Sequence, residues 1–530
     1  MPTSSRTGHT RIGLSLLAVL AALLAAACSS ASKPTVTHTQ SATTTNPKAT
    51  PPAGSWPYPN ADLANTRQAP GSVISSANVS QLQQAWTFRI TSKPDGGVGA
   101  LAMSPVVVNG VAYIQDMQAN VYALDLGTGK LRWEYQVNAA ELGGPGPDGV
   151  AVTDGRVYGD SPHTAFALSA ATGKPVWVDR NLLTSGQGAF SIQPQAVGGR
   201  VYLASSLGNG PGGGILLALD AATGKLIWKF NTMLGSDTAV RQVGAGGAWE
   251  PPLVGSDGSV TFGIGNPYES PAAAIAHPAQ LLYADSDVNL DAATGKLRWY
   301  YQAAPNDFQD HDLQTSPIAT TINGTSVLIA SGKAGYVYAI DAQTGALEWK
   351  TPVGVHNGHD NDGVLALEHK LHLTAPVTIE PGALGGVLSN PAVADDTVYV
   401  STVDEPITYT KLTQILGGAA PSTPTGQIEA LNLATGAVEW DTKLPEMALG
   451  AATVSNDLVF STLYGGELIA LNRTTGAIVY RHQLPTSTNA PLVIAGNTVI
   501  VSAGGPVTGG LVGGAAGGGG KAQIVAYTVP

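Results

Sequence analysis

One short sequence pattern recurs along this chain and constrains its fold more than any other feature. Residues 122–133 read YALDLGTGKLRW. The copies of this pattern lie at residues 122–133, 166–177, 217–228 and 288–299 and, more loosely, end at Trp349, Trp440 and Tyr480. Most copies join two short apolar segments through an Asp-x-x-Thr-Gly turn, in which glycine supplies a positive φ and the acidic side chain caps the turn. Each copy therefore predicts one β-hairpin.

A second pair of short apolar segments with its own turn precedes most copies, as in residues 105–113 and 391–399. Two pairs make a four-stranded unit, and such units at this spacing predict propeller blades. Seven units are counted by the motif glycines Gly129, Gly173, Gly224, Gly295, Gly345, Gly436 and Gly476. Trp86 precedes the first unit, and we expect its strand to pair with residues 522–529 and close the ring. The predicted fold class is all-β, an eight-bladed β-propeller of four-stranded antiparallel blades.

Composition supports this fold and excludes other classes of protein. The chain holds 65 Gly and 35 Pro in 530 residues, and only 12% of its residues are charged. Few charges disfavour long solvent-exposed helices, and 43% hydrophobic residues exclude disorder throughout. The net charge is −11, and no basic cluster follows the N-terminus, so nucleic acid is not an expected partner.

The N-terminus predicts export. Arg6, His9 and Arg11 precede an apolar run at residues 12–24, which is too short to span a membrane comfortably. Cys28, the only cysteine, follows three alanines, and the segment resembles a bacterial lipoprotein signal with Cys28 as the lipidated residue. An ordinary signal peptide cut nearby is the alternative.

The predicted organisation has three parts. Residues 1–27 form a lipoprotein signal peptide, residues 28–55 a Ser/Thr/Pro-rich flexible tether, and residues 56–530 the propeller. We expect an exported protein that is lipid-anchored to the extracytoplasmic face of a bacterial membrane, with the lipid as its only membrane contact.

The repeated Ala-x-Asp-x-x-Thr-Gly-Lys-x-x-Trp string resembles the tryptophan-docking motif of the quinoprotein alcohol dehydrogenases, whose cofactor is pyrroloquinoline quinone (PQQ). Residues 56–70 and 78–88 are also similar to the N-terminal segment of that family. The resemblance implies that the motif tryptophans pack between blades. Non-enzymatic propellers, including envelope scaffold lipoproteins, share the docking motif.

The same resemblance implies a cofactor site. Trp249, which lies outside the motif set, matches the tryptophan beneath the planar quinone, where stacking gives large contact area. Asn266, in Gly-Asn-Pro, matches an asparagine whose side-chain oxygen ligates Ca²⁺. The alternatives are a tryptophan buried in a blade or lining a dry channel, and a plain turn at Asn266.

Residues 299–317 resemble the family's acidic segment, and by that match Asp310 is the catalytic base and a Ca²⁺ ligand. We expect Asp307 and Asp312 to support the structure of the loop. Lys333 matches a cation that contacts the quinone oxygens. The alternatives are an acidic surface loop and a solvated lysine.

Four departures from the family pattern weaken this implication, and one of them is Ser389, which stands where the family has a tryptophan. Asn209 stands where the family has a glutamate ligand of Ca²⁺, and Asp148 where it has a cofactor-binding arginine. An acid at Asp148 would repel the carboxylates of the cofactor. The vicinal cysteine pair that covers the quinone is impossible in a chain with one cysteine.

Two functional hypotheses follow. The first is an extracytoplasmic oxidoreductase that uses PQQ and Ca²⁺ to oxidise an alcohol or sugar hydroxyl, and passes electrons to a separate carrier because no haem-attachment motif is present. The second is a non-catalytic propeller lipoprotein that binds envelope proteins or glycans as a scaffold. Residues 356–362 (HNGHDND) also carry metal-capable side chains and predict a solvated loop, with a metal or substrate site as the alternative.

Overall fold

The computed structural model describes residues 53–92, 99–137, 149–190, 192–208, 213–233, 246–418, 424–505 and 521–530. Within these ranges the chain forms short strands, the short helices α1 (Pro271–Ala276) and α2 (Asp362–Leu367), and the 3-10 turn η1 (Val79–Gln81). None of the helices in this part of the chain is long and apolar enough to cross a membrane.

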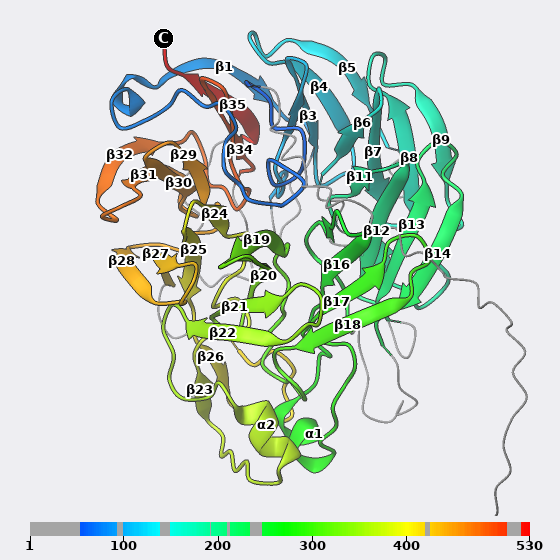
Figure 1. Ribbon diagram of the computed structural model, residues 1–530, viewed down its shortest axis with the longest axis vertical. Helices are drawn as coiled ribbons and strands as arrows, with labels where there is room; N and C mark the ends of the chain where they lie inside the picture. The colour runs from blue at the N-terminus through cyan, green and yellow to red at the C-terminus, as the bar shows by residue number, and fades with distance from the viewer. Residues whose placement is uncertain are drawn as a thin grey trace, which may run out of the picture. The chain divides into compact units, whose positions relative to one another are not determined.

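Eight antiparallel sheets of four main strands are arranged around a common centre as propeller blades (Figure 1). Blade 1 comprises β2 (Val106–Val108), β3 (Val111–Gln115), β4 (Val121–Asp125) and β5 (Leu131–Tyr135). Blade 2 comprises β6 (Ala151–Thr153), β7 (Arg156–Ser161), β8 (Thr164–Ser169) and β9 (Pro175–Asp179). Blade 3 comprises β11 (Gln195–Val197), β12 (Arg200–Ser206), β13 (Ile215–Asp220) and β14 (Leu226–Asn231), with β10 (Ala189–Phe190) also paired to β12.

The next blades follow in chain order. Blade 4 comprises β15 (Leu253–Val254), β16 (Ser259–Gly263), β17 (Ser286–Asp291) and β18 (Leu297–Gln302). Blade 5 comprises β19 (Ile318–Ile322), β20 (Thr325–Gly332), β21 (Tyr336–Asp341) and β22 (Leu347–Pro352). Blade 6 comprises β24 (Ala392–Ala394), β25 (Thr397–Asp404), β27 (Thr425–Asn432) and β28 (Val438–Leu444). Blade 7 comprises β29 (Thr453–Ser455), β30 (Leu458–Thr462), β31 (Glu467–Asn472) and β32 (Ile478–Gln483).

Blade 8 is built from both ends of the propeller sequence. It comprises β33 (Val493–Ala495), β34 (Thr498–Ala503), β35 (Gln523–Thr528) and β1 (Gln83–Arg89). Trp86 of β1 pairs with Ala526 of β35 in an antiparallel ladder. The predicted eight-bladed propeller and its closure by the C-terminal strand are therefore confirmed.

The motif tryptophans join neighbouring blades. Each of the seven donates its indole N–H to a backbone carbonyl in the turn of the next blade, at 2.8 to 3.2 Å. Its ring lies over the motif glycine of that blade. A Cβ added to one of these glycines would have its nearest neighbour at 2.5 to 2.7 Å, and this neighbour is a ring atom everywhere except at Gly436, where it is a hydroxyl. The eighth aromatic of this set, Tyr480, packs instead against the apolar core that includes blade 8. The predicted packing role of these tryptophans is confirmed.

We expect Gly295→Ala to destabilise the fold more than Gly110→Ala. Both glycines have a left-handed backbone, with φ of +69° and +71° respectively, so each alanine costs roughly 1–2 kcal/mol for its conformation. A Cβ at Gly295 would lie 2.6 Å from Trp228, whereas no atom lies within 4 Å of a Cβ at Gly110. Displacing the indole adds about 1–3 kcal/mol at Gly295 alone. Chemical denaturation of the two variants measures this difference, and equal losses of stability would contradict the docking role.

The segment before η1 binds to several blades. Trp56 pairs with Val107 of blade 1 through backbone hydrogen bonds of 2.9 and 2.8 Å, and Ala69 donates its N–H to Val454 of blade 7. Arg67 is 0% exposed, and its guanidinium donates to the backbone carbonyls of Ala452 and Leu492 and to three side chains. This segment therefore ties together blades that are far apart in sequence.

An insertion cap covers the connection between blades 4 and 5. The cap comprises α1, α2 and a two-stranded ribbon of β23 (Val377–Ile379) and β26 (Ile407–Tyr409), which lie together in the lower part of Figure 1. Its apolar side chains enclose Phe308, which is 2% exposed and belongs to that connection. Three segments, one within blade 4, one between blades 5 and 6 and one within blade 6, thus hold this loop.

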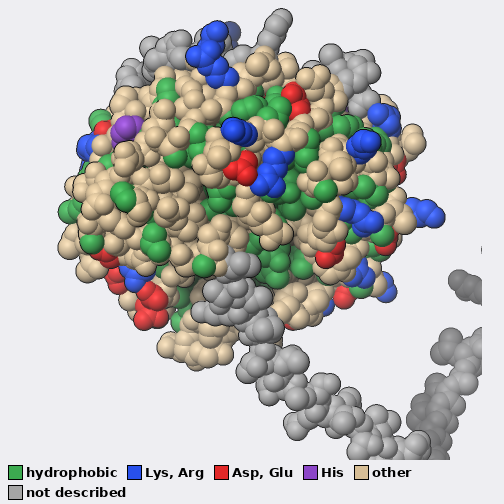
Figure 2. Space-filling model, turned by 90° about the horizontal axis from the view of Figure 1, so that it is seen from above, with side chains coloured by type: hydrophobic (Ala, Val, Ile, Leu, Met, Phe, Trp, Pro, Cys, Tyr) green, Lys and Arg blue, Asp and Glu red, His purple; other side chains and the backbone are tan. Residues whose placement is uncertain are grey.

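The outer strands of the blades leave apolar side chains exposed next to the docking aromatics, including Leu131, Val176, Leu226, Leu347 and Val438. Figure 2 shows hydrophobic side chains scattered among uncharged polar ones on one face, with few charged groups. This surface agrees with the low charge content of the sequence.

Candidate functional site

The loop that follows β18 brings three carboxylates into the interior. Asp307, Asp310 and Asp312 are 3%, 4% and 0% exposed. Buried carboxylates need cations or hydrogen-bond donors, because desolvation strongly disfavours their charge. The alternative of a solvated acidic loop is therefore wrong for this segment.

Lys333 supplies a cation to two of these carboxylates. It follows the end of β20, and its Nζ lies 2.9 Å from Asp310 Oδ2 and 2.7 Å from Asp312 Oδ2. Its backbone N–H also donates to the carbonyl of Asp312 at 2.9 Å. The alternative of a solvated lysine is also wrong, since Lys333 is 8% exposed.

The pKa values of Asp310 and Lys333 are both raised from their ordinary values. Burial raises the pKa of Asp310 well above its ordinary value, Lys333 opposes the shift, and Asp312 adds to it. Burial alone would lower the pKa of Lys333, but Asp310 and Asp312 outweigh it, so the pKa is raised and the ammonium stays charged. One ammonium between two carboxylates leaves room for a further positive charge.

Asn266 joins the acidic loop from blade 4. Its backbone N–H donates to Asp312 Oδ1 at 2.5 Å, and its side-chain Nδ2 donates to Asp310 Oδ1. Its side-chain Oδ1 is buried and has no hydrogen-bond partner in the described part of the chain. An unsatisfied amide oxygen beside a carboxylate is the kind of donor set that Ca²⁺ prefers.

Trp249 lies at the same place. It is half-buried, and its indole Nε1 is 3.1 Å from the point that a Cβ on Gly265 would occupy, while Asp312 Oδ1 is 2.7 Å from that point. The glycine before Asn266 thus allows the indole and the carboxylate to approach the same stretch of backbone. The structure therefore brings together four residues singled out from the sequence: Trp249, Asn266, Asp310 and Lys333.

Three other residues singled out from the sequence are Asn209, Asp148 and Cys28. All three lie outside the described residues. Among the residues that are described, no group of three or more His, Cys, Asp or Glu side chains is placed to hold a metal ion. A cation at this site therefore depends on the amide oxygen of Asn266 together with Asp310.

Sequence reasoning missed Asp285, which precedes β17. It is 0% exposed, and neither carboxylate oxygen has a hydrogen-bond partner within the described ranges. Burial and then the charges of Asp307, Asp312 and Asp310 raise its pKa well above the ordinary value. Asp285 lies in the sequence Ala-Asp-Ser-Asp, which carries no motif, so only the fold places it beside the acidic loop.

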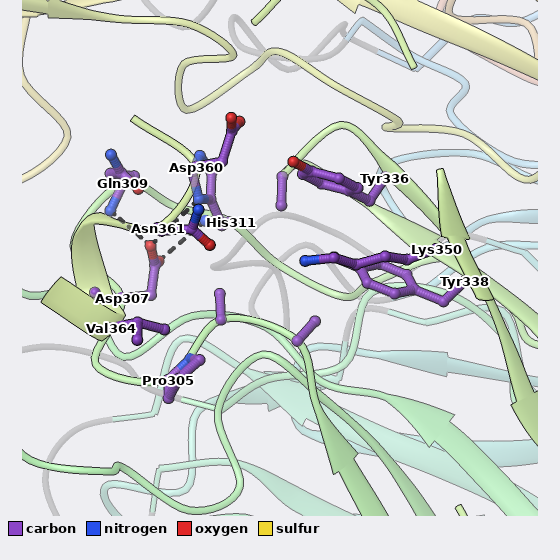
Figure 3. A pocket seen from close by; sticks show the side chains of 14 residues that line it. Pro305, Asp307, Gln309, His311, Tyr336, Tyr338, Lys350, Asp360, Asn361 and Val364 are labelled. Atoms are coloured by element: carbon purple, nitrogen blue, oxygen red, sulfur yellow. Dashed lines mark hydrogen bonds and ion pairs between the residues drawn. The ribbon is translucent and has the colours of Figure 1, made fainter. Parts of the chain in front are cut away.

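A pocket lies against the other side of the acidic loop (Figure 3). Asp307, Gln309 and His311 face it, opposite Tyr336 and Lys350 of blade 5. The loop thus presents alternate side chains to the two sides, with Asp310 and Asp312 turned to Lys333.

The prediction of a solvated loop at residues 356–362 is confirmed in part: residues 356–361 form a loop in which Asn357, Gly358 and Asn361 are exposed, but its histidines are paired with aspartates. His356 Nδ1 lies 2.5 Å from Asp360 Oδ1, and His359 Nδ1 lies 2.8 Å from Asp362 Oδ2. Asp362 is 3% exposed and begins α2. Local ion pairs therefore build this segment into the insertion cap.

Two protein-family models match parts of the chain. The family model "Glucose/ethanol/alcohol dehydrogenase, beta-propeller domain" matches residues 56–353, more than half of the chain. A second model, "Outer membrane protein assembly factor BamB", matches residues 424–521.

Single proteins extend the comparison. The chain is 30% identical over 327 residues to quinohemoprotein alcohol dehydrogenase ADH-IIG of Pseudomonas putida, a match that covers 56% of this chain and 45% of that enzyme. The match thus spans less than half the length of that curated relative. The crystal structure of quinohemoprotein alcohol dehydrogenase from Comamonas testosteroni superposes with a TM-score of 0.75 at 22% identity, covering 90% of this chain and 80% of that one. A europium-containing methanol dehydrogenase superposes with a TM-score of 0.72 at 18% identity, covering 90% and 98%. The chain therefore belongs to the PQQ-dependent alcohol dehydrogenase-like family of eight-bladed propellers.

Proposed function

We propose that this protein is an extracytoplasmic quinoprotein oxidoreductase that oxidises an alcohol or a sugar hydroxyl with PQQ and Ca²⁺. The observation that carries the proposal is the convergence of Asp310, Lys333 and Asn266, with the Asn266 amide oxygen left without a partner. Its family supports the reaction class, while the choice of an alcohol or sugar is our proposal.

The residues present fit both groups. Asn266 Oδ1 and the Asp310 carboxylate would hold the cation, with Asn209 as a proposed third ligand. Lys333 would face the quinone oxygens, and Trp249 would lie against the quinone plane. The chemistry that the bound groups supply is hydride acceptance by the quinone, with the cation as a Lewis acid on its carbonyl.

Asp310 is the base in this proposal. Its carboxylate takes the proton from the substrate hydroxyl as the hydride leaves the neighbouring carbon. The Lys333 ammonium, 2.9 Å from Asp310 Oδ2, opposes the effect of burial and favours the ionised carboxylate that a base requires. We assign onward electron transfer to a separate carrier, because a haem-attachment motif needs two cysteines and the sequence has one.

Steady-state dye reduction tests the proposal. The full chain, purified in detergent and supplied with PQQ and Ca²⁺, should reduce an artificial electron acceptor with a panel of primary alcohols and sugars. Omitting PQQ should abolish the rate. A panel in which no substrate gives quinone-dependent reduction would contradict the proposal.

A second function is favoured by a separate observation. The match of residues 424–521 to the BamB family model supports a non-catalytic propeller that binds envelope proteins or glycans as a scaffold. This alternative predicts no saturable quinone binding.

Anchoring through Cys28 is part of the proposal. Cys28→Ser should move the protein from the membrane fraction to the soluble exported fraction, because a lipid-modified cysteine is the proposed membrane contact. Detergent partitioning followed by immunoblotting measures this change. Unchanged partitioning would count against lipidation.

A further inference from the structure

The backbone on both sides of Asp310 is held by one buried side chain. The Asp307 carboxylate accepts the backbone N–H of Gln309 at 2.9 Å and that of His311 at 3.0 Å. Asp310 lies between these two donors and has a φ of +68°. Residues other than glycine avoid this left-handed region unless the surrounding structure holds them there.

The same turn occurs twice more in the described chain, which shows that the two hydrogen bonds and the positive φ belong together. In the first, Asp62 accepts the backbone N–H of Ala64 at 3.0 Å and that of Thr66 at 3.0 Å, and Asn65 has a φ of +62°. In the second, Asp116 accepts the backbone N–H of Gln118 at 2.9 Å and that of Asn120 at 2.9 Å, and Ala119 has a φ of +66°. In every copy an aspartate accepts from the second and fourth residues after it, and the third is left-handed. Only the copy in the acidic loop carries a carboxylate on the left-handed residue.

The left-handed conformation sets the direction of the Asp310 side chain. With this backbone, Asp310 Oδ2 lies 2.9 Å from Lys333 Nζ and Asp310 Oδ1 accepts from Asn266 Nδ2. Gln309 and His311, the flanking residues, face the pocket on the opposite side of the loop. A change of φ at Asp310 would turn its carboxylate away from Lys333 and Asn266.

We propose that Asp307 is a positioning residue, whose carboxylate fixes the backbone around Asp310 and thereby aims the Asp310 carboxylate at the reacting atoms. This inference rests on the proposed function of Asp310 as the base. A displacement of about 1 Å at a reacting group costs on the order of 10²-fold in rate. Asp307 therefore acts on turnover without touching substrate or cofactor.

Asp307→Asn tests the inference. An amide keeps one acceptor oxygen, but its NH₂ group is a donor and cannot accept the second backbone N–H of the turn. We expect kcat to fall about 10- to 100-fold, with KM and the Kd for PQQ within about threefold of wild type. Hydrogen exchange at residues 306–312 should become faster, and this readout does not depend on activity. The control is Asp116→Ala, because both N–H donors of that turn share Asp116 Oδ1 and an asparagine could keep them. It removes both hydrogen bonds of the turn that carries Ala119, and should speed local exchange while leaving kcat unchanged.

A second variant covers the case in which Asp307→Asn fails to fold. The Tyr409 hydroxyl donates to the Phe308 carbonyl at 2.8 Å from the insertion cap, so Tyr409→Phe removes a different restraint on the same loop. It should lower kcat in the same direction by a smaller factor, with KM unchanged.

The outcomes separate cleanly. Faster exchange together with a selective fall in kcat supports the inference. Unchanged exchange, or faster exchange with unchanged kcat, would overturn it, as would an equal fall in kcat in Asp116→Ala. A wild type without quinone-dependent turnover would overturn the proposed function, whereas the exchange measurements would still show whether Asp307 holds the loop.

Discussion

Asp310→Asn is expected to lower dye reduction by about 10² to 10⁴-fold, the usual cost of losing a general base. The substitution keeps an oxygen that can ligate a cation, but it removes the group that accepts the substrate proton. It also leaves Lys333 with one carboxylate, Asp312, at 2.7 Å. PQQ binding should therefore survive, though weaker than in wild type.

The measurement is kcat with PQQ and Ca²⁺ at saturating alcohol, together with the Kd for PQQ. Asp257→Asn is the control, because Asp257 is an exposed carboxylate of blade 4, the blade before the acidic loop, and pairs with Arg298 on the surface. It should leave both quantities unchanged. An Asp310→Asn variant that turns over within about threefold of wild type would exclude Asp310 as the base.

Trp228→Ala is expected to cost about 3–5 kcal/mol of folding free energy, as for other buried aromatic truncations. Its indole is 7% exposed, covers Gly295 of the next blade and donates to the Ala292 carbonyl at 3.1 Å. Removing it opens a cavity between blades and leaves that carbonyl with only the longer hydrogen bond from the Tyr202 hydroxyl, at 3.5 Å.

Trp249→Ala provides the contrast. Trp249 is half-buried and lies outside the docking set, so its loss should spare most of the folding free energy and weaken PQQ binding. Denaturant unfolding and fluorescence titration of both variants give the comparison. If both lower stability equally and neither changes PQQ affinity, Trp249 is a core residue only.

The fold could be predicted because its information is local and repeated. Each hairpin carries its own turn residues, and each motif glycine marks where the preceding tryptophan packs. The seven motifs therefore counted seven blades, and the strand of Trp86 added the eighth. In the turn of blade 1, for example, Asp125 accepts from both the backbone and the hydroxyl of Thr128, as the sequence pattern predicted.

The site was predictable only in part, because much of it depends on contacts between distant segments. Asp310, Lys333, Asn266 and Trp249 were found through a family resemblance, and the structure places them together. Asp285 carries no local signal, and its role as a buried neighbour appears only when β17 packs beside the acidic loop. The left-handed turn at Asp310 was also invisible, since nothing in the sequence separates it from an ordinary acidic loop.

The insertion cap explains why the loop at residues 356–362 is less solvated than expected. A stretch rich in Asn, Asp, His and Gly is typical of a solvated loop. Here His–Asp pairs hold the charged side chains, and the loop leads into α2, whose Ala366 packs with Leu371 around Phe308. Local composition could not predict this, because the apolar partners come from other insertions.

The most direct test of the central claim, that this propeller keeps a quinone site, is an equilibrium titration of the full chain with PQQ, read by tryptophan fluorescence. The account predicts saturable quenching in the presence of Ca²⁺, weaker quenching when a chelator removes the cation, and a further loss of affinity in Asn266→Ala. A lanthanide ion in place of Ca²⁺ forms a second arm, because two carboxylates beside Asn266 can also suit a cation of higher charge. No saturable quenching with either cation would contradict the account and favour a scaffold propeller.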